Sequence, residues 1–211
     1  MEACVSADEP CYARLIRSGA NVNARDRFAC TAAHEAAMSD CASCLADLAR
    51  AGADLNASNK WGQTPLQFAA GRRRTRALAF LLTRVTDVNH GDMYGNTPLH
   101  DAAAEDAVTS MDALFAHGAN PYARNKFGRS PLHFAARAGS VRAVNWLLGH
   151  GANPLAADSE GRRPRSYAEE RNYGDFRMAA AALRVAEAQA ARKRHSTRGS
   201  ERSHERPAGS R

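Results

Sequence analysis

Three histidines and a pair of cysteines are the side chains of this chain with the plainest capacity for chemistry. An imidazole can act as a general base or bind a metal ion. However, His34, His100 and His133 are separated by steps of about 33 residues or twice that, and each lies three positions after a Thr or Ser. A histidine that recurs with a fixed period belongs to a repeated unit, so we predict a structural role for all three.

Cys41 and Cys44 have the Cys-x-x-Cys spacing of zinc and redox sites. No second cysteine pair completes a four-ligand zinc site. The pair also lies in a helical segment instead of following a strand, which is where a redox pair is expected. A site that adds the nearby Cys30 and His34 stays open as an alternative. We interpret Cys41 and Cys44 as two ordinary thiols, one of them half-buried.

The chain shows no other motif that is typical of an enzyme. No glycine-rich phosphate loop precedes a helix, and no Gly-x-Ser-x-Gly nucleophile motif is present. We therefore predict that the protein has no catalytic residue, no cofactor and no metal ion, and that it is not an enzyme.

The elements that position these residues repeat along the sequence in one register. The motif Thr-Pro-Leu-His begins at Thr97, and its intact or degraded copies begin at Thr31, Thr64, Ser130 and Arg163. A Gly-Ala pair closes the units with the same step, beginning at Gly19, Gly52, Gly118 and Gly151, whereas Val85-Thr86 departs from it. The step is about 33 residues. Two independent markers in one register indicate a repeat protein.

Local chemistry predicts two helices in each unit, as residues 92–124 illustrate. A tight turn begins at Asp92 and includes a Gly, which supplies the positive φ that such turns need. Thr97 caps a first short helix and Pro98 takes its first position, where no N–H is missed. A second helix runs to about His117 and ends before a Gly. One such pair cannot bury its own apolar face, so the pairs must stack.

This pattern resembles the ankyrin-repeat family, and the resemblance covers roughly residues 1–183. It implies an all-α fold, an α-solenoid of stacked helix–turn–helix repeats with β-hairpin loops, followed here by a disordered C-terminal tail. In that family the histidine of the repeated motif hydrogen-bonds backbone and ties neighbouring hairpins together. Gln67 replaces this histidine in one repeat and can still hydrogen-bond.

The resemblance divides the chain into repeats and terminal units. The predicted parts are an N-terminal partial or capping repeat (1–25), four ankyrin repeats (26–58, 59–91, 92–124 and 125–157), a C-terminal capping repeat or helix (158–191) and a basic disordered tail (192–211). The repeat at 26–58 is degraded, since Ala29 replaces the Gly of its turn. We expect it to be looser than the others.

The resemblance also implies where a partner binds, because hairpin tips and the inner face of the first helices form the concave binding surface of ankyrin proteins. An aromatic residue stands two positions after the turn Asp or Asn in four consecutive units. Stacking would align these rings along the hairpin tips. The predicted partner-binding residues are Phe28, Lys60, Trp61, Tyr94, Asn96, Lys126, Phe127, Arg129 and Arg137. The alternative is that the rings only pack on the neighbouring tips.

The net charge of +7 resides mainly in the tail, since residues 192–211 hold seven Arg or Lys and two Glu. The predicted binding face is also biased toward basic residues. It therefore favours a protein partner with an acidic or mixed-charge surface, and a function as scaffold, adaptor or regulatory subunit. The alternative function is nucleic-acid or anionic-surface binding through Arg72–Arg76 and the basic tail.

The sequence predicts a monomer without membrane contact that is located in the cytoplasm or the nucleus. The first residues lack a basic region followed by an apolar run, and no apolar stretch approaches the roughly 20 residues of a membrane span. Five irregularly spaced cysteines do not indicate a disulfide framework, which favours a reducing compartment. The cluster Arg192–Arg194 is a candidate nuclear-import signal.

Overall fold

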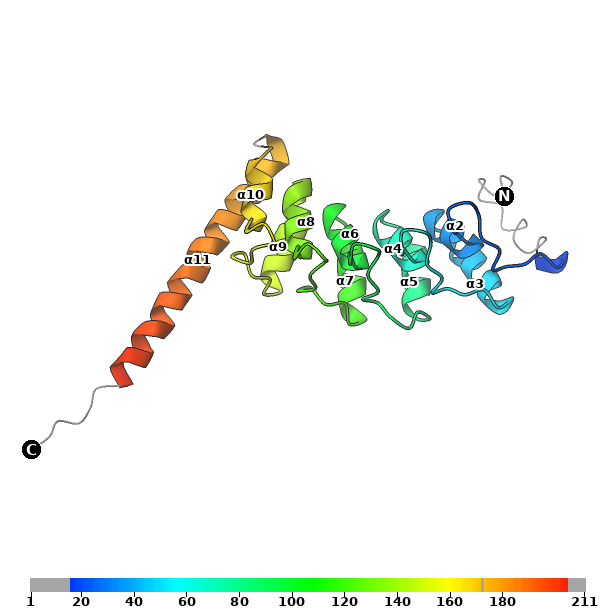
Figure 1. Cartoon of the computed structure of the whole chain (residues 1–211), viewed down its shortest axis with the longest axis horizontal. Coiled ribbons are helices and arrows are strands. Elements are labelled where there is room, and N and C mark those ends of the chain that lie inside the picture. The colour runs from blue at the N-terminus through cyan, green and yellow to red at the C-terminus, as the bar shows by residue number, and fades with distance from the viewer. Residues whose placement is uncertain (1–15, 172, 205–211) are drawn as a thin grey trace, which may run out of the picture.

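The structure is a computed structural model that describes residues 16–171 and 173–204. Within those residues it is helical and contains no strand. The elements are α2 (Ala32–Met38), α3 (Ala42–Arg50), α4 (Pro65–Ala70), α5 (Thr75–Leu82), α6 (Pro98–Ala104), α7 (Val108–Ala116), α8 (Pro131–Ala138), α9 (Val141–Gly149), α10 (Pro164–Glu169) and α11 (Gly174–His204). Successive helix pairs stack side by side into an elongated array, and α11 projects from its C-terminal end (Figure 1).

The predicted α-solenoid is confirmed, but the β-hairpin loops are not β-strands in the described residues. Each loop is a tight turn closed by backbone hydrogen bonds. In the turn at Asp92, the Gly95 N–H donates to the Asp92 carbonyl at 2.8 Å, and the Asp92 N–H donates to the Asn96 carbonyl at 3.0 Å. These two bonds are too few to form an extended ladder, so the turn has hairpin pairing without strand length.

The first helix of each repeat starts at a capping box, as the sequence predicts. Thr97 precedes α6, its side chain is paired with the backbone of His100, and the His100 side chain pairs with the Thr97 backbone in return. The same box opens α2, α4 and α8, with Gln67 replacing the histidine in α4. Pro occupies the first turn of α4, α6 and α8. Capping residues and Pro thus fix where each first helix begins.

The repeated histidines also connect neighbouring repeats, as the family resemblance implies. The Thr97 N–H donates to His100 Nδ1 at 3.1 Å, which leaves the proton on Nε2, and Nε2 then donates to the Arg129 carbonyl at 3.1 Å. His34 and His133 make the equivalent bonds to the carbonyls of Gln63 and Arg162. Each ring therefore satisfies one orphan N–H of its own helix and one carbonyl of the next turn.

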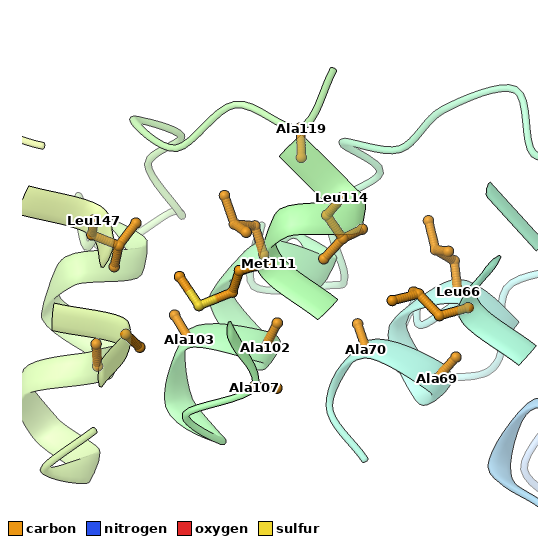
Figure 2. Packing of buried hydrophobic residues seen from close by; sticks show 14 of the residues in the cluster. Leu66, Ala69, Ala70, Ala102, Ala103, Ala107, Met111, Leu114, Ala119 and Leu147 are labelled. Atoms are coloured by element: carbon orange, nitrogen blue, oxygen red, sulfur yellow. The ribbon is translucent and has the colours of Figure 1, made fainter. Parts of the chain in front are cut away.

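The core is a continuous layer of alanine and leucine side chains between the stacked pairs (Figure 2). The inner helices contribute small residues such as Ala102 and Ala103, and the outer helices contribute larger ones such as Met111 and Leu114; all four are fully buried. Alanines let the first helices approach closely, and the larger side chains fill the space behind them. The layer gives each repeat a partner on both sides.

Aspartates in the turn between paired helices reach across to the next repeat. Asp40 Oδ1 accepts the N–H of Ala77, at the start of α5, at 2.8 Å. Asp106 Oδ1 accepts the N–H of Ala143, at the start of α9, at 2.7 Å. A cationic residue, Arg73, occupies the corresponding position of the intervening repeat, with a φ of 57° like Asp40. Because Arg73 has no carboxylate, its side chain cannot accept an N–H at the start of α7.

Replacing Arg73 by Asp should stabilise the protein, since Asp accepts a positive φ more readily than Arg and its carboxylate would face the N-terminus of α7. These gains should outweigh the loss of the exposed bond from the Arg73 guanidinium to the Glu105 carbonyl. We expect a gain of about 1 kcal/mol in the free energy of unfolding, measured by urea denaturation. The converse change, Asp40→Ala, should lower it by a similar amount. Suppose that Arg73→Asp leaves the free energy of unfolding unchanged or lowers it, while Asp40→Ala lowers it. Position 73 then does not face the N-terminus of α7 in the way that position 40 faces that of α5.

The C-terminal end is closed by α10 and α11. Tyr167 of α10 is buried and its hydroxyl donates to Asp158 at 2.5 Å. Arg165 replaces the apolar residue of the repeat motif and pairs with Glu187 of α11 at 3.2 Å. These polar substitutions make the outer side of the last unit compatible with water, which is what a terminal repeat requires.

Two terminal predictions differ from the structure or lie outside it. α11 continues to His204, beyond residue 191 where the sequence placed the end of the capping helix. Up to residue 191 the sequence of α11 is rich in Ala, a strong helix former, whereas residues 192–204 contain no Ala and include Gly199. Residues 205–211 of the predicted tail lie outside the described residues, as do residues 1–15 of the predicted N-terminal partial repeat.

Candidate functional site

The tips of the loops form a regular ladder along one edge of the array. The residue after each turn Asp or Asn donates its N–H to the carbonyl of the aromatic residue in the preceding tip. These bonds are Lys60 to Phe28, Met93 to Trp61, Lys126 to Tyr94 and Ser159 to Phe127, at 2.9, 2.7, 2.9 and 2.9 Å. One backbone bond per step fixes the spacing of the tips, so the side chains they carry are held in phase.

A positive φ is required at the end of each tip. Gly62, Gly95 and Gly128 have φ values of 75°, 79° and 70°. A Cβ on Gly62 would lie 2.8 Å from the Met93 nitrogen, so the following tip leaves no space for one. Ala29 keeps the same conformation with a φ of 60°, at the energetic cost that a non-glycine residue bears there. The degraded repeat thus retains the shape of its turn.

The four predicted aromatic residues lie on successive tips and are all partly exposed. Their exposed fractions are 39% for Phe28, 43% for Trp61, 46% for Tyr94 and 44% for Phe127. The Phe28 and Trp61 rings stack with centroids 5.5 Å apart, and those of Tyr94 and Phe127 are 6.2 Å apart. The rings therefore pack on each other and still offer a large apolar area to solvent. Packing of the rings on neighbouring tips is therefore compatible with partner binding by the same rings.

Three of the predicted cationic residues are exposed. Lys60 and Lys126 stand beside the aromatic row on their tips. Arg137 extends from the end of α8, and its guanidinium lies 5.9 Å from the centre of the Phe134 ring. Lys60 and Lys126 therefore place positive charge beside the rings, and Arg137 adds positive charge at the far end of α8.

Two of the predicted binding residues are occupied by contacts within the protein. The Asn96 side-chain oxygen accepts from Asn125 at 2.8 Å, and its amide donates to Asp92 at 3.0 Å. Arg129 pairs with Asp158 at 3.3 Å and with Glu160 at 3.1 Å. Sequence spacing places both residues on the tips, but it does not show which polar groups the neighbouring tip already uses.

The Asp158 carboxylate is the centre of the polar network at the last tip. Burial alone would raise its pKa, but hydrogen bonds from the Tyr167 hydroxyl, from the N–H groups of Arg162 and Glu160, and from Arg129 outweigh burial. They hold the pKa of Asp158 well below its ordinary value. Arg129 is therefore a structural partner of a permanently charged carboxylate.

The exposed side of the first helices carries a second periodic set, which the sequence analysis missed. Phe68, Asp101 and Phe134 occupy the same position of α4, α6 and α8, and each is partly exposed. Arg72 lies over the Phe68 ring at 4.7 Å. Burial between the neighbouring helices raises the pKa of Asp101 to about 7, against the opposing influence of Gln67 and Arg72. The position after the motif histidine, compared at the repeat period, would have revealed this set.

Outer helices carry another aromatic cluster that was not predicted as a surface. Phe115 of α7 is 42% exposed and contacts the rings of Trp146 and His150 edge to face. The Trp146 indole N–H donates to Asp112 at 2.6 Å. Trp146 packs against the core and is only partly buried.

Cys41 and Cys44 form a disulfide, and the interpretation as two thiols is wrong. Cys41 is the N-cap of α3 and Cys44 lies in its first turn, which brings the two Cα atoms to 5.2 Å. This separation is within the usual range for a disulfide. A redox pair is expected after a strand, whereas here the N-terminus of α3 brings the two sulfurs together. Cys30 is a buried free thiol.

One hollow lies away from the aromatic row. It has a volume of about 430 Å³ and is lined by the turns between paired helices, including Arg73, Asp106 and Arg142. Arg73 donates to the Glu105 carbonyl and Asp106 caps α9, so these groups already have structural partners. No group of three or more potential metal ligands occurs in the part of the chain that the structure describes. No helix among those residues is long and apolar enough to cross a membrane.

Comparison with known proteins identifies a family for this chain. Two family models match the chain: one described as ankyrin repeats (3 copies) matches residues 34–125, and one described as ankyrin repeats (many copies) matches residues 114–168. Together the matches run without a gap over the helix pairs from α2 to α10. No curated protein matches the chain.

Proposed function

Because the chain belongs to the ankyrin-repeat family, whose repeats are protein-interaction modules, we propose that it binds a partner protein through its loop tips and the adjoining side of its first helices, without catalysing a reaction. This side corresponds to the concave face of ankyrin arrays. The observation that carries the proposal is the exposed aromatic row on a ladder of hydrogen-bonded tips. Partly exposed Trp and Tyr held in fixed positions are typical of binding hot spots.

The charge beside the row supports a partner with an acidic or mixed-charge surface. Lys60 and Lys126 are exposed beside the row and Arg137 at the end of α8, whereas Asp101 is a carboxyl whose raised pKa leaves it partly neutral near pH 7. Electrostatic complementarity of this kind speeds association and excludes wrong partners more than it adds affinity. A scaffold, adaptor or regulatory subunit acting as a monomer in the cytoplasm or nucleus fits this surface.

The double substitution Trp61→Ala with Tyr94→Ala should weaken partner binding at least about tenfold, because each ring is a candidate hot spot on the order of 2 kcal/mol. Affinity capture from a cell lysate with the wild type identifies the partner, and titration calorimetry then compares the two proteins. Circular dichroism checks that the fold persists, as expected for side chains that are more than 40% exposed.

Tyr122→Ala is the matched control for that measurement. Tyr122 is 56% exposed, but it lies on the loop after α7 with its hydroxyl bonded to the His150 carbonyl, away from the tips. It should leave partner affinity unchanged. Full affinity in the folded double variant, or an equal loss in the control, would exclude the tip row as the binding surface.

Nucleic-acid binding through Arg72–Arg76 has less support. Arg72 lies over Phe68 and Arg73 donates to the Glu105 carbonyl, so only Arg74 and Arg76 of this run stand without those contacts. A steep salt dependence of RNA or DNA binding that disappears with Arg74→Ala and Arg76→Ala would favour this function over the protein-binding one.

A further inference from the structure

The disulfide at the start of α3 has two unequal sulfur atoms. Cys44 is 4% exposed and packs in the core, whereas Cys41 is only partly buried at the N-cap position. The Cys44 N–H donates to Cys41 Sγ at 3.2 Å, and the Ser43 hydroxyl lies 3.4 Å from the same sulfur. A thiol arriving from solvent therefore meets Cys41 first.

We propose that Cys41 and Cys44 form a reversible thiol–disulfide exchange site for a small thiol of the glutathione class, in which Cys41 is the sulfur that is attacked and Cys44 is the buried resolving sulfur. This activity is separate from partner binding at the tips. It rests on the asymmetry of burial and on the position of Cys41 at a helix N-terminus, where backbone N–H groups stabilise a thiolate.

The exchange balances with two thiols as the reductant. A thiolate attacks Cys41 Sγ, the bond between the two protein sulfurs breaks, and its electron pair leaves on Cys44 Sγ, which takes up a proton. A second thiolate attacks the sulfur of the small molecule in the mixed disulfide and releases Cys41 as a thiolate. One protein disulfide becomes two thiols, and two small thiols become one disulfide. Oxidised glutathione drives the same steps in reverse.

Cys30 provides an internal comparison. It is 7% exposed, and burial raises the pKa of its thiol, with a weaker opposing effect from its contact with Asn59. It lies before the first helix of its repeat and not at the N-terminus of α3. A buried thiol with a raised pKa is expected to be inert, so the two sites should differ in reactivity within one protein.

The test uses the full chain with Cys4→Ser and Cys11→Ser, which removes the two cysteines outside the described residues. The protein is equilibrated with mixtures of reduced and oxidised glutathione, quenched with acid, alkylated and analysed by mass spectrometry. We expect the fraction of the Cys41–Cys44 bond to follow the glutathione ratio while circular dichroism shows a folded protein and Cys30 stays free. A bond that never forms, or that is reduced only after unfolding in urea, would overturn the proposal.

Two single variants assign the roles of the sulfurs. In the same background Cys44→Ser should take up one glutathione on Cys41, whereas Cys41→Ser should react at least about tenfold more slowly at the buried Cys44. The Cys30→Ser variant should titrate like its parent. Equal reactivity of Cys41 and Cys44 in the folded variants would contradict the assignment of attacked and resolving sulfurs.

Discussion

Replacing His100 and His133 by Gln should make the protein markedly less sensitive to acid. Burial lowers the pKa of both histidines to about 4, and the hydrogen bonds to the Arg129 and Arg162 carbonyls oppose this only in part. The unfolded chain, with ordinary pKa values near 6.5, therefore binds more protons between about pH 6.5 and pH 4. The two neutral histidines contribute fully to the free energy of unfolding above pH 6.5. As the pH falls toward 4 this contribution is lost, which lowers the free energy of unfolding by about 3 kcal/mol per histidine.

Urea denaturation of the wild type and of the double variant at pH 7 and pH 4.5 measures this effect. Gln is the matched replacement because Gln67 already makes the same connection, donating to the Asn96 carbonyl at 2.8 Å. Asp101 acts with the opposite sign: its pKa is raised to about 7, so the folded state gains protons, and stability, as the pH falls from 7 to 4. The comparison is therefore made with Asp101→Asn in both proteins, which removes the titration of Asp101. Equal losses of stability in the two proteins would mean that the histidines are not held neutral.

Leu99→Ala should lower the free energy of unfolding by about 2–5 kcal/mol. Leu99 is fully buried in α6, which packs against both α4 and α8, so the cavity lies in the middle of the array. Stability in a stacked repeat protein is a sum of units and the interfaces between them. Weakening a central unit should also broaden the urea transition, because the two halves lose part of their coupling.

Val185→Ala is the control for the cavity prediction. Val185 is 59% exposed on α11, so its replacement should change stability by no more than about 0.5 kcal/mol. Circular dichroism and tryptophan fluorescence should be followed together, since Trp61 and Trp146 lie on opposite sides of Leu99 in the sequence. A loss below about 1 kcal/mol for Leu99→Ala would show that the central interface relaxes to fill the cavity.

Most of the fold could be predicted from local signals in the sequence. Thr97, Pro98 and His100 each have a role that depends on one helix start and on one step of the period, so residue type and spacing were sufficient. The aromatic row was found in the same way. These features depend on contacts between equivalent positions of neighbouring repeats, and such positions recur in the sequence at a fixed spacing.

Features that depend on what a side chain meets across a repeat boundary were harder to predict. Asn96 and Arg129 occupy binding positions, but Asn125 and Asp158 of the following tips hold them. Asp40 looks like an ordinary loop residue until its bond to Ala77 is seen. The disulfide of Cys41 and Cys44 was not predicted, because it depends on the turn that brings the two residues together at the N-terminus of α3.

The ladder of single backbone bonds between tips has a consequence for how the gene can change in length. Each tip is registered to the one before it by the N–H of one residue and the carbonyl of another, as Met93 is to Trp61. Insertion or deletion of one amino acid between Trp61 and Met93 would place a different N–H opposite the Trp61 carbonyl and break that step of the ladder. Duplication or excision of a whole unit would preserve the alignment, so the surface can grow or shrink only in complete periods.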